Sequence, residues 1–310
     1  MKVLFVDTVN PLIFNELEKN KILCDTAYNK TKNEISKIIN QYEGIVIRSR
    51  FKIDKDFINA AKNLKFIARA GSGTENIDIH YARSKKIICF NAAAGNRQAV
   101  AEHALAMILS LLNNINHSDS EIRNGIWNRE ANRGTEISGK TFGIIGLGNN
   151  GMAFANLLKS FNVKILAYDK YRMSYPYQTN MQHIYKEADF ISLHIPLSKE
   201  TKYLVNDHFI KQFKKPIYVI NTSRGKCVKT SSLVKGLKNK KILGACLDVL
   251  EQETISYESL VVNNKMKDLK YLFDSKKTIL TPHIAGWTKE SDIKIAKIIS
   301  KKIIKKLKTS

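Results

Sequence analysis

Along the first part of the chain, short apolar runs alternate with stretches in which apolar residues recur at helical spacing. The strand-length runs are KVLFVD at 2–7, GIVI at 44–47 and LKFIARA at 64–70, and the helix-like stretches are 11–21 and 57–62. Strands that alternate with helices are typical of α/β domains built around a parallel sheet. We therefore predict such a domain in the first third of the sequence.

The pattern changes after position 90 and then resumes. NAAAGN at 91–96 precedes a long apolar helix that ends near Leu112, and a polar stretch follows to about Lys140. From Thr141 a second alternating series begins, with the runs TFGIIG, VKILAYD, ADFISLHIP, PIYVINTS, ILGACLDV and TILTPHI. The two series predict an α/β protein of two Rossmann-like, doubly wound domains with a cleft between them, which suits a chain of 310 residues.

The composition is that of a folded globular protein, with 44% hydrophobic and 25% charged residues. The first residues lack the longer apolar region and the cleavage site of a secretory signal, and no apolar run reaches the roughly 18 residues of a membrane span. We therefore expect a cytoplasmic protein without a membrane segment. Because the four cysteines are widely separated, we expect free thiols and no structural metal site.

The formal net charge of +23 is compatible with nucleic-acid binding. Most basic residues are scattered lysines, however, and no zinc-finger or RNA-binding motif is present. In the densest cluster, from Lys294 to Lys308, isoleucines recur at helical spacing, so these lysines are expected on the solvated face of an amphipathic helix. We interpret the charge as solvated surface and expect no nucleic-acid partner.

A glycine-rich turn follows the first strand of the second series. Gly146, Gly148 and Gly151 have GxGxxG spacing, and Asp169 ends the next strand roughly 20 residues later. Gly146 would permit the tight turn, Gly148 the approach of a pyrophosphate to a helix N-terminus, and Gly151 the close packing of helix on strand. Asp169 would bind the ribose hydroxyls and repel a 2′-phosphate. The motif therefore predicts an NAD site rather than an NADP site.

Three later strands end in polar side chains suited to the oxidation of a hydroxy acid. That reaction needs a cation to fix the carboxylate, a base to take the hydroxyl proton and a partner to hold the base. Arg224 in NTSRG, His283 in TPHIAGW and Glu253 in CLDVLEQE supply these groups in that order. Each residue alone has an ordinary structural explanation. Their joint occurrence after a dinucleotide turn predicts that they form a catalytic set.

With these motifs the chain resembles the D-isomer-specific 2-hydroxyacid dehydrogenases over nearly its whole length. RAGSGTENID is similar to the family's substrate-carboxylate loop, NAAAGNRQAVAEHALAMIL to its interdomain helix and HIPLSKET to its cofactor-contacting loop. The resemblance implies that residues 1–93 and 282–310 form a substrate-binding domain, and that residues 94–281 form an NAD-binding domain. It also implies that the cleft closes on the substrate.

The resemblance further implies which residues contact ligands. Backbone N–H groups at Gly71, Ser72 and Gly73 would bind the substrate carboxylate. The cofactor would be contacted by the glycine turn and by loops after later strands, with Asp248 near the nicotinamide carboxamide. The implied cofactor residues are Gly146, Gly148, Asn149, Asn150, Gly151, Asp169, His194, Pro196, Thr201, Thr222 and Asp248.

Within the family the likeness is greatest to the phosphoglycerate dehydrogenases, in IVIRSRFKID, ARAGSGTENID and RNGIWNREANRGTEISGKTFGIIGLG. These segments place Arg48, Arg69 and Arg129 where that branch binds a phosphate, and several guanidinium groups match its double charge. Ser49 is a further implied substrate-binding residue. Arg129 is expected to come from the other subunit of a homodimer. The implied reaction is the NAD-dependent oxidation of 3-phosphoglycerate to 3-phosphohydroxypyruvate in serine biosynthesis.

Some positions depart from the family's pattern. Thr254 follows Glu253 where proline is usual, Ala93 stands where the family has NAP, and the segment from Thr254 to Thr278 is expected to be a long loop. The chain ends soon after the His283 segment. We therefore expect a short form, without the C-terminal regulatory domain that some members carry.

Two other functions stay open at this stage. A glyoxylate or hydroxypyruvate reductase of the same family would keep Arg224, Glu253 and His283 but would not need the additional arginines. A non-enzymatic, NAD-sensing co-repressor can share the fold, and the basic charge gives it slight support, but no recognition motif is present. Turnover of 3-phosphoglycerate with NAD would separate the three functions.

Overall fold

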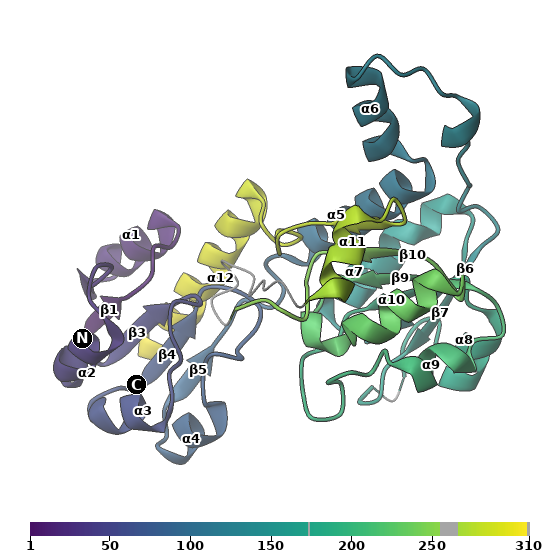
Figure 1. The fold of residues 1–310 in the computed structure, drawn as a ribbon. Coiled ribbons are helices and arrows are strands. Elements are labelled where there is room, and N and C mark those ends of the chain that lie inside the picture. The colour runs from purple at the N-terminus through teal and green to yellow at the C-terminus, as the bar shows by residue number, and fades with distance from the viewer. Residues whose placement is uncertain (173, 255–265, 309–310) are drawn as a thin grey trace. The chain divides into compact units, whose positions relative to one another are not determined.

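The computed structural model describes residues 1–172, 174–254 and 266–308, and its chain divides into two compact units (Figure 1). The first unit holds Met1–Arg97 and the residues from Trp287 onward, and the second holds Gln98–Glu253 and the residues that lead up to Gly286. The chain therefore leaves the first unit and later returns to it. Among the described residues, no helix combines the length and the apolar character needed to cross a membrane.

The first unit is built on a five-stranded parallel sheet in the order β2-β1-β3-β4-β5. Its strands are β1 (Lys2–Phe5), β2 (Leu23–Thr26), β3 (Gly44–Ile47), β4 (Phe66–Arg69) and β5 (Ile88–Phe90). Its helices are α1 (Pro11–Lys19), α2 (Lys32–Ile38), α3 (Lys55–Ala60), α4 (Ile79–Ser84) and α12 (Lys289–Lys308), with a 3-10 turn η1 (Ile39–Gln41).

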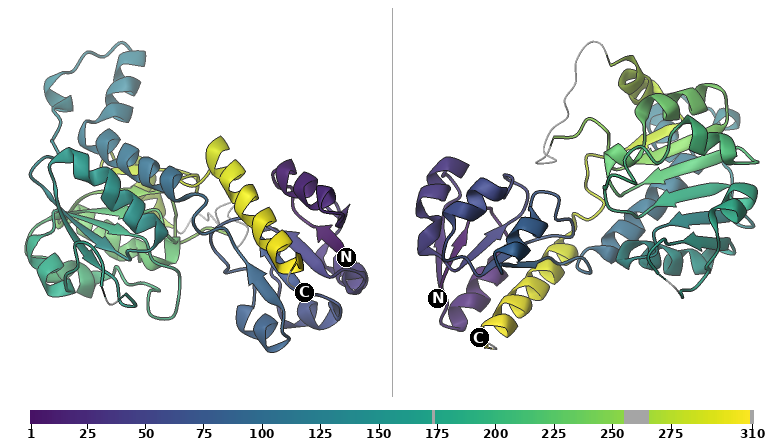
Figure 2. Two further views of the ribbon diagram at one scale, coloured as in Figure 1. Left: turned by 180° about the vertical axis from the view of Figure 1, so that it is seen from behind. Right: turned by 90° about the horizontal axis from the view of Figure 1, so that it is seen from below.

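Alternate strand residues point to opposite faces of this sheet and build two separate cores. Leu4 and Ile45 pack in the core that α2, α3 and α4 cover. Val3 and Val46 pack in the core covered by α1 and α12 on the opposite face (Figure 2). Both faces are apolar, as a doubly wound sheet requires.

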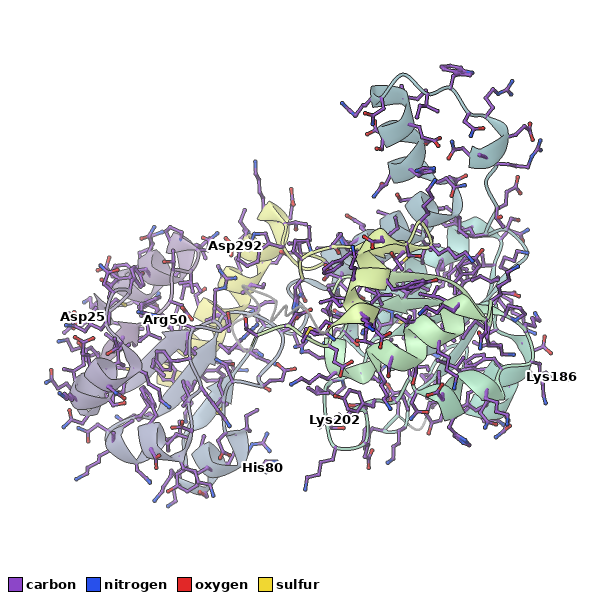
Figure 3. All side chains as sticks on the ribbon, in the orientation of Figure 1. Asp25, Arg50, His80, Lys186, Lys202 and Asp292 are labelled. Atoms are coloured by element: carbon purple, nitrogen blue, oxygen red, sulfur yellow. The ribbon has the colours of Figure 1, made fainter. Side chains whose placement is uncertain are left out.

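Helix α12 confirms the amphipathic helix that the sequence predicts, and it begins a few residues before Lys294. Ala296, Ile299 and Ile303 are fully buried, while the lysines between them face the solvent. Lys186 and Lys202 likewise point outward from the second unit (Figure 3). Much of the large positive charge is therefore solvated surface.

The second unit contains a six-stranded parallel sheet in the order β11-β10-β9-β8-β6-β7. Its strands are β6 (Thr141–Ile145), β7 (Lys164–Tyr168), β8 (Phe190–Leu193), β9 (Ile217–Asn221), β10 (Ile242–Leu247) and β11 (Thr278–Leu280). Its helices are α5 (Arg97–Leu112), α6 (Ile115–Arg123), α7 (Asn149–Leu158), α8 (Met181–Glu187), α9 (Asp207–Gln212), α10 (Thr230–Lys238) and α11 (Lys267–Asp274). Its 3-10 turns are η2 (Glu130–Asn132), η3 (Lys159–Phe161) and η4 (Gly225–Cys227).

Strand β6 lies between β7 and β8, so the chain order reverses at this strand. Helices α5 and α7 pack against one face of the sheet, and α8 to α11 pack against the other. Ligands of such sheets bind beyond the carboxyl ends of the strands at the point of reversal. The second unit is therefore a doubly wound α/β domain, as predicted, with its binding edge at the end of β6.

Two segments differ from the sequence-based expectation. The polar stretch before Lys140 contains α6, which buries none of its residues and has isoleucine only at Ile115 and Ile122, too few apolar positions for a pattern to reveal a helix. Part of the expected loop from Thr254 to Thr278 is helix α11, which buries only Leu269 and Leu272. The rest of that expected loop, at 255–265, lies outside the described residues.

Candidate active site

The glycine-rich turn lies at the carboxyl end of β6. Gly146 has a φ of +90°, and a Cβ there would lie 2.6 Å from the carbonyl oxygen of His194. A Cβ at Gly151, in the first turn of α7, would lie 2.1 Å from the carbonyl oxygen of Gly146. Both glycines are thus required by the protein's own packing, which confirms the structural roles predicted for them.

Gly148 differs, because a Cβ there would meet nothing within 4 Å. It precedes α7, and no side chain caps that helix. Two other residues predicted to contact the cofactor have buried polar atoms, Asn150 Oδ1 and Thr222 Oγ1, without a hydrogen-bond partner among the described residues. Open space at a helix N-terminus fits the pyrophosphate portion of NAD. The two unpaired atoms are available to other groups of the cofactor, the Asn150 oxygen as an acceptor only.

Asp169, which directly follows β7, is hydrogen-bonded to the glycine turn. Its Oδ2 accepts from the N–H of Leu147 (2.8 Å), and its Oδ1 accepts from the N–H of Tyr171 (3.0 Å). Each oxygen keeps a further lone pair for a ribose hydroxyl. The adjacent Lys170 pairs with Glu200 at 2.7 Å, and this hydrogen bond raises the pKa of Lys170. The positive charge next to Asp169 is therefore paired with a carboxylate.

The loop after β8 begins with His194, a partly buried residue whose Nδ1 is inaccessible to solvent. Burial lowers the pKa of His194 to about 4, so the imidazole is neutral near neutral pH. Its Nε2 lies 2.8 Å from the Ser192 hydroxyl, and its Nδ1 has no partner within the described part of the chain. Further along, the Thr201 hydroxyl donates to the carbonyl oxygen of Pro196 at 2.6 Å. Thr201 and Pro196 thus stabilise the loop itself.

His283 and Glu253 form a direct pair. Nδ1 of His283 lies 2.8 Å from Oε2 of Glu253, and Oε1 of Glu253 accepts the N–H of Leu250. The two side chains are mostly buried, with 23% and 12% of their surfaces exposed. A carboxylate on one ring nitrogen orients the imidazole and fixes which nitrogen faces the substrate, as a histidine base requires.

Arg224 follows β9 on a loop that packs against the segment leading to Glu253. The side-chain amide of Asn221 donates to the carbonyl oxygen of Arg224 at 3.0 Å. A Cβ at Gly225 would lie only 1.8 Å from the carbonyl oxygen of Leu250, so only glycine permits this approach of the two loops. The sequence predicts Arg224 and Glu253, but it does not indicate the role of Gly225.

Asp248, which follows β10, is 1% exposed and organises the segment that carries His283. Its carboxylate accepts the Thr281 hydroxyl (2.7 Å) and the backbone N–H groups of Ile284 (2.8 Å) and Ala285 (2.9 Å). This scaffolding role is additional to the nicotinamide contact that the sequence predicts. No motif or spacing in the sequence indicates it.

In the first unit, the predicted phosphate residues lie at the carboxyl ends of β3 and β4. Arg69 Nε donates to the carbonyl oxygen of Arg48 at 3.2 Å, and the Arg48 guanidinium carbon lies 4.1 Å from the ring centre of Trp287. The N–H of Arg48, just before Ser49, donates to Asp7 Oδ2 at 2.6 Å. The two arginines therefore sit together at one edge of the sheet, held partly by Asp7, which the sequence does not single out.

The 71–73 loop follows β4. The N–H of Gly71 donates to the carbonyl oxygen of Arg69 at 2.8 Å. This N–H, one of the three expected to bind a carboxylate, is therefore already hydrogen-bonded within the loop. The Ser72 hydroxyl donates to Asn96 Oδ1 at 2.6 Å and fixes the loop. The N–H groups of Ser72 and Gly73 have no acceptor in the described chain and remain available.

Arg129 lies on an arm, residues 115–133, that includes α6 and η2 and extends from the second unit (Figures 1 and 2). Trp127 is 80% exposed, and Ile122 and Ile126 are about half exposed. Arg129 itself is exposed. The arm therefore presents large apolar side chains to the solvent beside the predicted phosphate residue.

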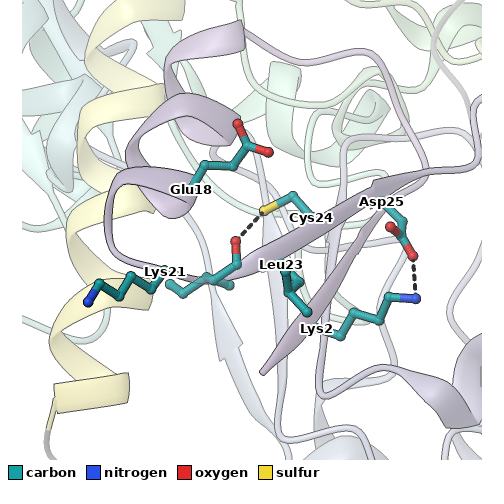
Figure 4. Close-up of a pocket in the computed structure, with 7 residues that line it drawn as sticks. Lys2, Glu18, Lys21, Leu23, Cys24 and Asp25 are labelled. Atoms are coloured by element: carbon teal, nitrogen blue, oxygen red, sulfur yellow. Dashed lines mark hydrogen bonds and ion pairs between the residues drawn. The ribbon is translucent and has the colours of Figure 1, made fainter.

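A groove of about 370 Å³ lies at the β2 edge of the first sheet (Figure 4). Lys2 and Asp25 form an ion pair across it at 2.7 Å. Burial, and then the carboxylates of Glu18 and Asp25, raise the pKa of Cys24 to about 12, so this thiol is protonated and unreactive near neutral pH. No residue predicted for catalysis or ligand binding lines the groove.

The sequence and fold define a known enzyme family. A family model described as the NAD-binding domain of D-isomer specific 2-hydroxyacid dehydrogenases matches residues 105–285. The chain belongs to this family, and its second unit is the NAD-binding domain. The predictions of the family, the two-domain α/β fold and the NAD cofactor are thereby confirmed.

Individual relatives show the range of activities in the family. The chain is 32% identical to D-3-phosphoglycerate dehydrogenase of Archaeoglobus fulgidus, over 98% of this chain and 57% of that protein. It is 34% identical to hydroxypyruvate reductase of Thermotoga maritima, over 91% of this chain and 90% of that protein. It thus spans little more than half the length of several curated phosphoglycerate dehydrogenases that it matches.

A solved structure shows the same fold. It is that of D-lactate dehydrogenase from Aquifex aeolicus complexed with NAD and lactic acid, with a TM-score of 0.84 and 26% identity. The match covers 100% of this chain and 96% of that chain.

Proposed function

We propose that this protein is an NAD-dependent dehydrogenase that oxidises D-3-phosphoglycerate to 3-phosphohydroxypyruvate. The observation that carries the proposal is the His283–Glu253 pair at 2.8 Å within an NAD-binding domain. A histidine held by a carboxylate is the arrangement needed to take the proton of a substrate hydroxyl while its carbon loses hydride. The proposal places the reaction in serine biosynthesis.

Each residue of the set has a separate task. NAD, when bound, supplies the hydride acceptor. His283 takes the hydroxyl proton, and Glu253 stabilises the imidazolium that results. Arg224 binds the substrate carboxylate with its planar guanidinium, which a point charge such as that of Lys cannot replace. The scaffold around Asp248 keeps the His283 segment in place during this transfer.

The choice of substrate rests on the arginines outside this set. Arg48 and Arg69 lie together at the edge of the first sheet and would neutralise the phosphate of 3-phosphoglycerate. We propose that Arg129 is contributed by the second copy in a homodimer, because its arm exposes Trp127 and neighbouring isoleucines. Apolar surface of this kind is typical of a subunit interface.

A hydroxypyruvate or glyoxylate reductase is the second candidate. The T. maritima hydroxypyruvate reductase is matched over 90% of its own length, whereas the A. fulgidus phosphoglycerate dehydrogenase is matched over 57%. Such an enzyme would use the same three catalytic residues and would have no phosphate to bind.

Kinetics with both substrate types test the proposal. The protein should reduce NAD with 3-phosphoglycerate at a higher kcat/KM than it shows for unphosphorylated glycerate. Replacing Arg48 or Arg69 by Ala should lower kcat/KM for 3-phosphoglycerate about 10- to 150-fold, the scale of one charge-assisted hydrogen bond, and affect glycerate much less. Equal losses on both substrates would support the reductase, and no turnover of any hydroxy acid would support an NAD-sensing protein.

Subunit mixing tests the position of Arg129. Arg129→Ala and Arg224→Ala proteins should each be weakly active alone. After exchange of subunits, some heterodimers should contain one site with both residues intact and recover activity above either parent. If exchange is verified by mass and no activity returns, Arg129 does not act across the dimer.

A further inference from the structure

The segment that carries His283 has an unusual backbone. His283 has a φ of +57°, in the left-handed region that residues other than glycine rarely adopt. Its N–H donates to the carbonyl oxygens of Asp248 (2.8 Å) and Thr281 (3.0 Å), and the next two N–H groups along the chain donate to the Asp248 carboxylate. The direction of the imidazole therefore depends on how firmly Asp248 and Thr281 are held.

A histidine from a distant part of the sequence also contacts this network. His103 of α5 places Nε2 at 3.0 Å from the Thr281 hydroxyl and 3.6 Å from Oδ1 of Asp248. The His103 side chain is 22% exposed, so it is largely shielded from solvent. The position of α5 is in turn fixed by its packing on the sheet, where Ala104 and Ile108 are buried.

The groups that carry a proton determine the direction of these hydrogen bonds. An ionised carboxylate only accepts, so the single Thr281 proton is directed to Asp248 Oδ1 at 2.7 Å. The Thr281 oxygen must then accept from His103, which requires a proton on Nε2 of that ring. The sulfur of Met107, at 3.9 Å from the same hydroxyl, is a much weaker competitor.

We propose that His103 is a positioning residue for the histidine base: its Nε2–H donates to Thr281, which fixes the turn that directs His283. This inference rests on the proposed role of His283. The polar contacts of His103 in the described chain are with Thr281 and Asp248, so we assign it no contact with the substrate. Its loss should therefore lower kcat and leave KM for substrate and NAD within about 2-fold, since misdirection of the base affects the chemical step.

Three substitutions, two at His103 and one at Thr281, test the proposal. His103→Leu removes the donor at similar volume and should lower kcat by about 10-fold, the scale of one buried hydrogen bond. His103→Gln offers an amide N–H near the position of Nε2 and should restore most of that loss. In a Thr281→Val background the Leu substitution should have almost no further effect, because its acceptor is already gone. His208→Leu, at an exposed histidine of α9, is the matched control and should leave kcat unchanged.

A measurement that does not depend on enzyme activity also tests the proposal. The ¹⁵N shifts of the His103 ring should show the Nε2–H tautomer in the wild-type protein, and Thr281→Val should change them. The proposal is overturned by an Nδ1–H tautomer, by a wild-type kcat in His103→Leu, by equal kcat values for Leu and Gln, or by additive losses with Thr281→Val. Glu253→Gln distinguishes failure of the proposed function from failure of this inference. If it leaves kcat unchanged, the role proposed for His283 fails, whatever the His103 variants show.

Discussion

The second unit should lose stability in acid through His194. Burial gives this imidazole a pKa of about 4, whereas in the unfolded chain it has a pKa of about 6.5. Between these two values the unfolded chain binds more protons than the folded chain does. The contribution of His194 to the free energy of unfolding is therefore complete above about pH 6.5, decreases as the pH falls, and is lost below about pH 4.

The size of the effect follows from the two pKa values. Their difference is about 2.5 units, and each unit corresponds to 1.36 kcal/mol, so protonation of His194 should cost about 3 kcal/mol of stability. That is a large part of the 5–15 kcal/mol typical of a folded protein. The His194 ring lies beside that of Phe154 in α7, with ring centroids 5.4 Å apart, and this apolar neighbour offers no hydrogen bond to a charged imidazole.

Urea unfolding from about pH 7 to about pH 4, followed by circular dichroism, measures this loss. The comparison is with His194→Gln, which keeps an amide near the Ser192 hydroxyl but does not titrate. Titrations of other groups cancel in the difference, so the advantage of wild type over the variant should shrink by about 3 kcal/mol toward pH 4. His208→Gln, at an exposed histidine, should follow the wild-type curve. Parallel curves for wild type and His194→Gln would refute the reasoning, since the ring would then titrate equally in both states.

Further predictions concern the cofactor and substrate residues. Gly151→Ala should lower the melting temperature even without NAD, because its Cβ would lie 2.1 Å from a backbone oxygen. Gly148→Ala should leave the melting temperature unchanged but lower the affinity for NAD measured by calorimetric titration. Arg224→Lys should retain NAD affinity and lose most turnover, and near-normal kcat would remove Arg224 from the proposed site. Asp169→Ala should lower NAD affinity and narrow the preference over NADP; an unchanged ratio of the two dissociation constants would contradict its proposed contact.

Elements buried on both sides could be predicted from sequence. The GIVI run coincides with β3, whose four residues are all buried, because a central parallel strand must be apolar on both faces. Strand β2 could not be predicted in this way. It lies at the sheet edge, Leu23 is 65% exposed, and Asp25 pairs with Lys2, so its residues follow no apolar pattern.

The candidate site likewise contains residues that the sequence can indicate and contacts that it cannot. Side chains with reactive chemistry, such as Arg224 and His283, can be recognised as residue types at strand ends. The contacts that hold them depend on three-dimensional packing: His103 reaches Thr281 across 178 positions of sequence, and no local spacing rule connects them. Gly225 also has no local signal, since its requirement comes from the carbonyl of Leu250 on another loop.

The return of the chain to the first unit has a consequence for synthesis on the ribosome. Helix α12 covers the face of the first sheet that carries Val3 and Val46, yet about 190 residues separate Arg97 from Trp287. At a translation rate of about 5–20 residues per second, that face remains without helix α12 for about 10–40 s. During this interval the nascent first unit exposes part of its core, while the sequence of the second unit emerges. Ribosome-bound chains that stop before Lys289 should therefore recruit chaperones through the first unit, and chains that extend past α12 should release them.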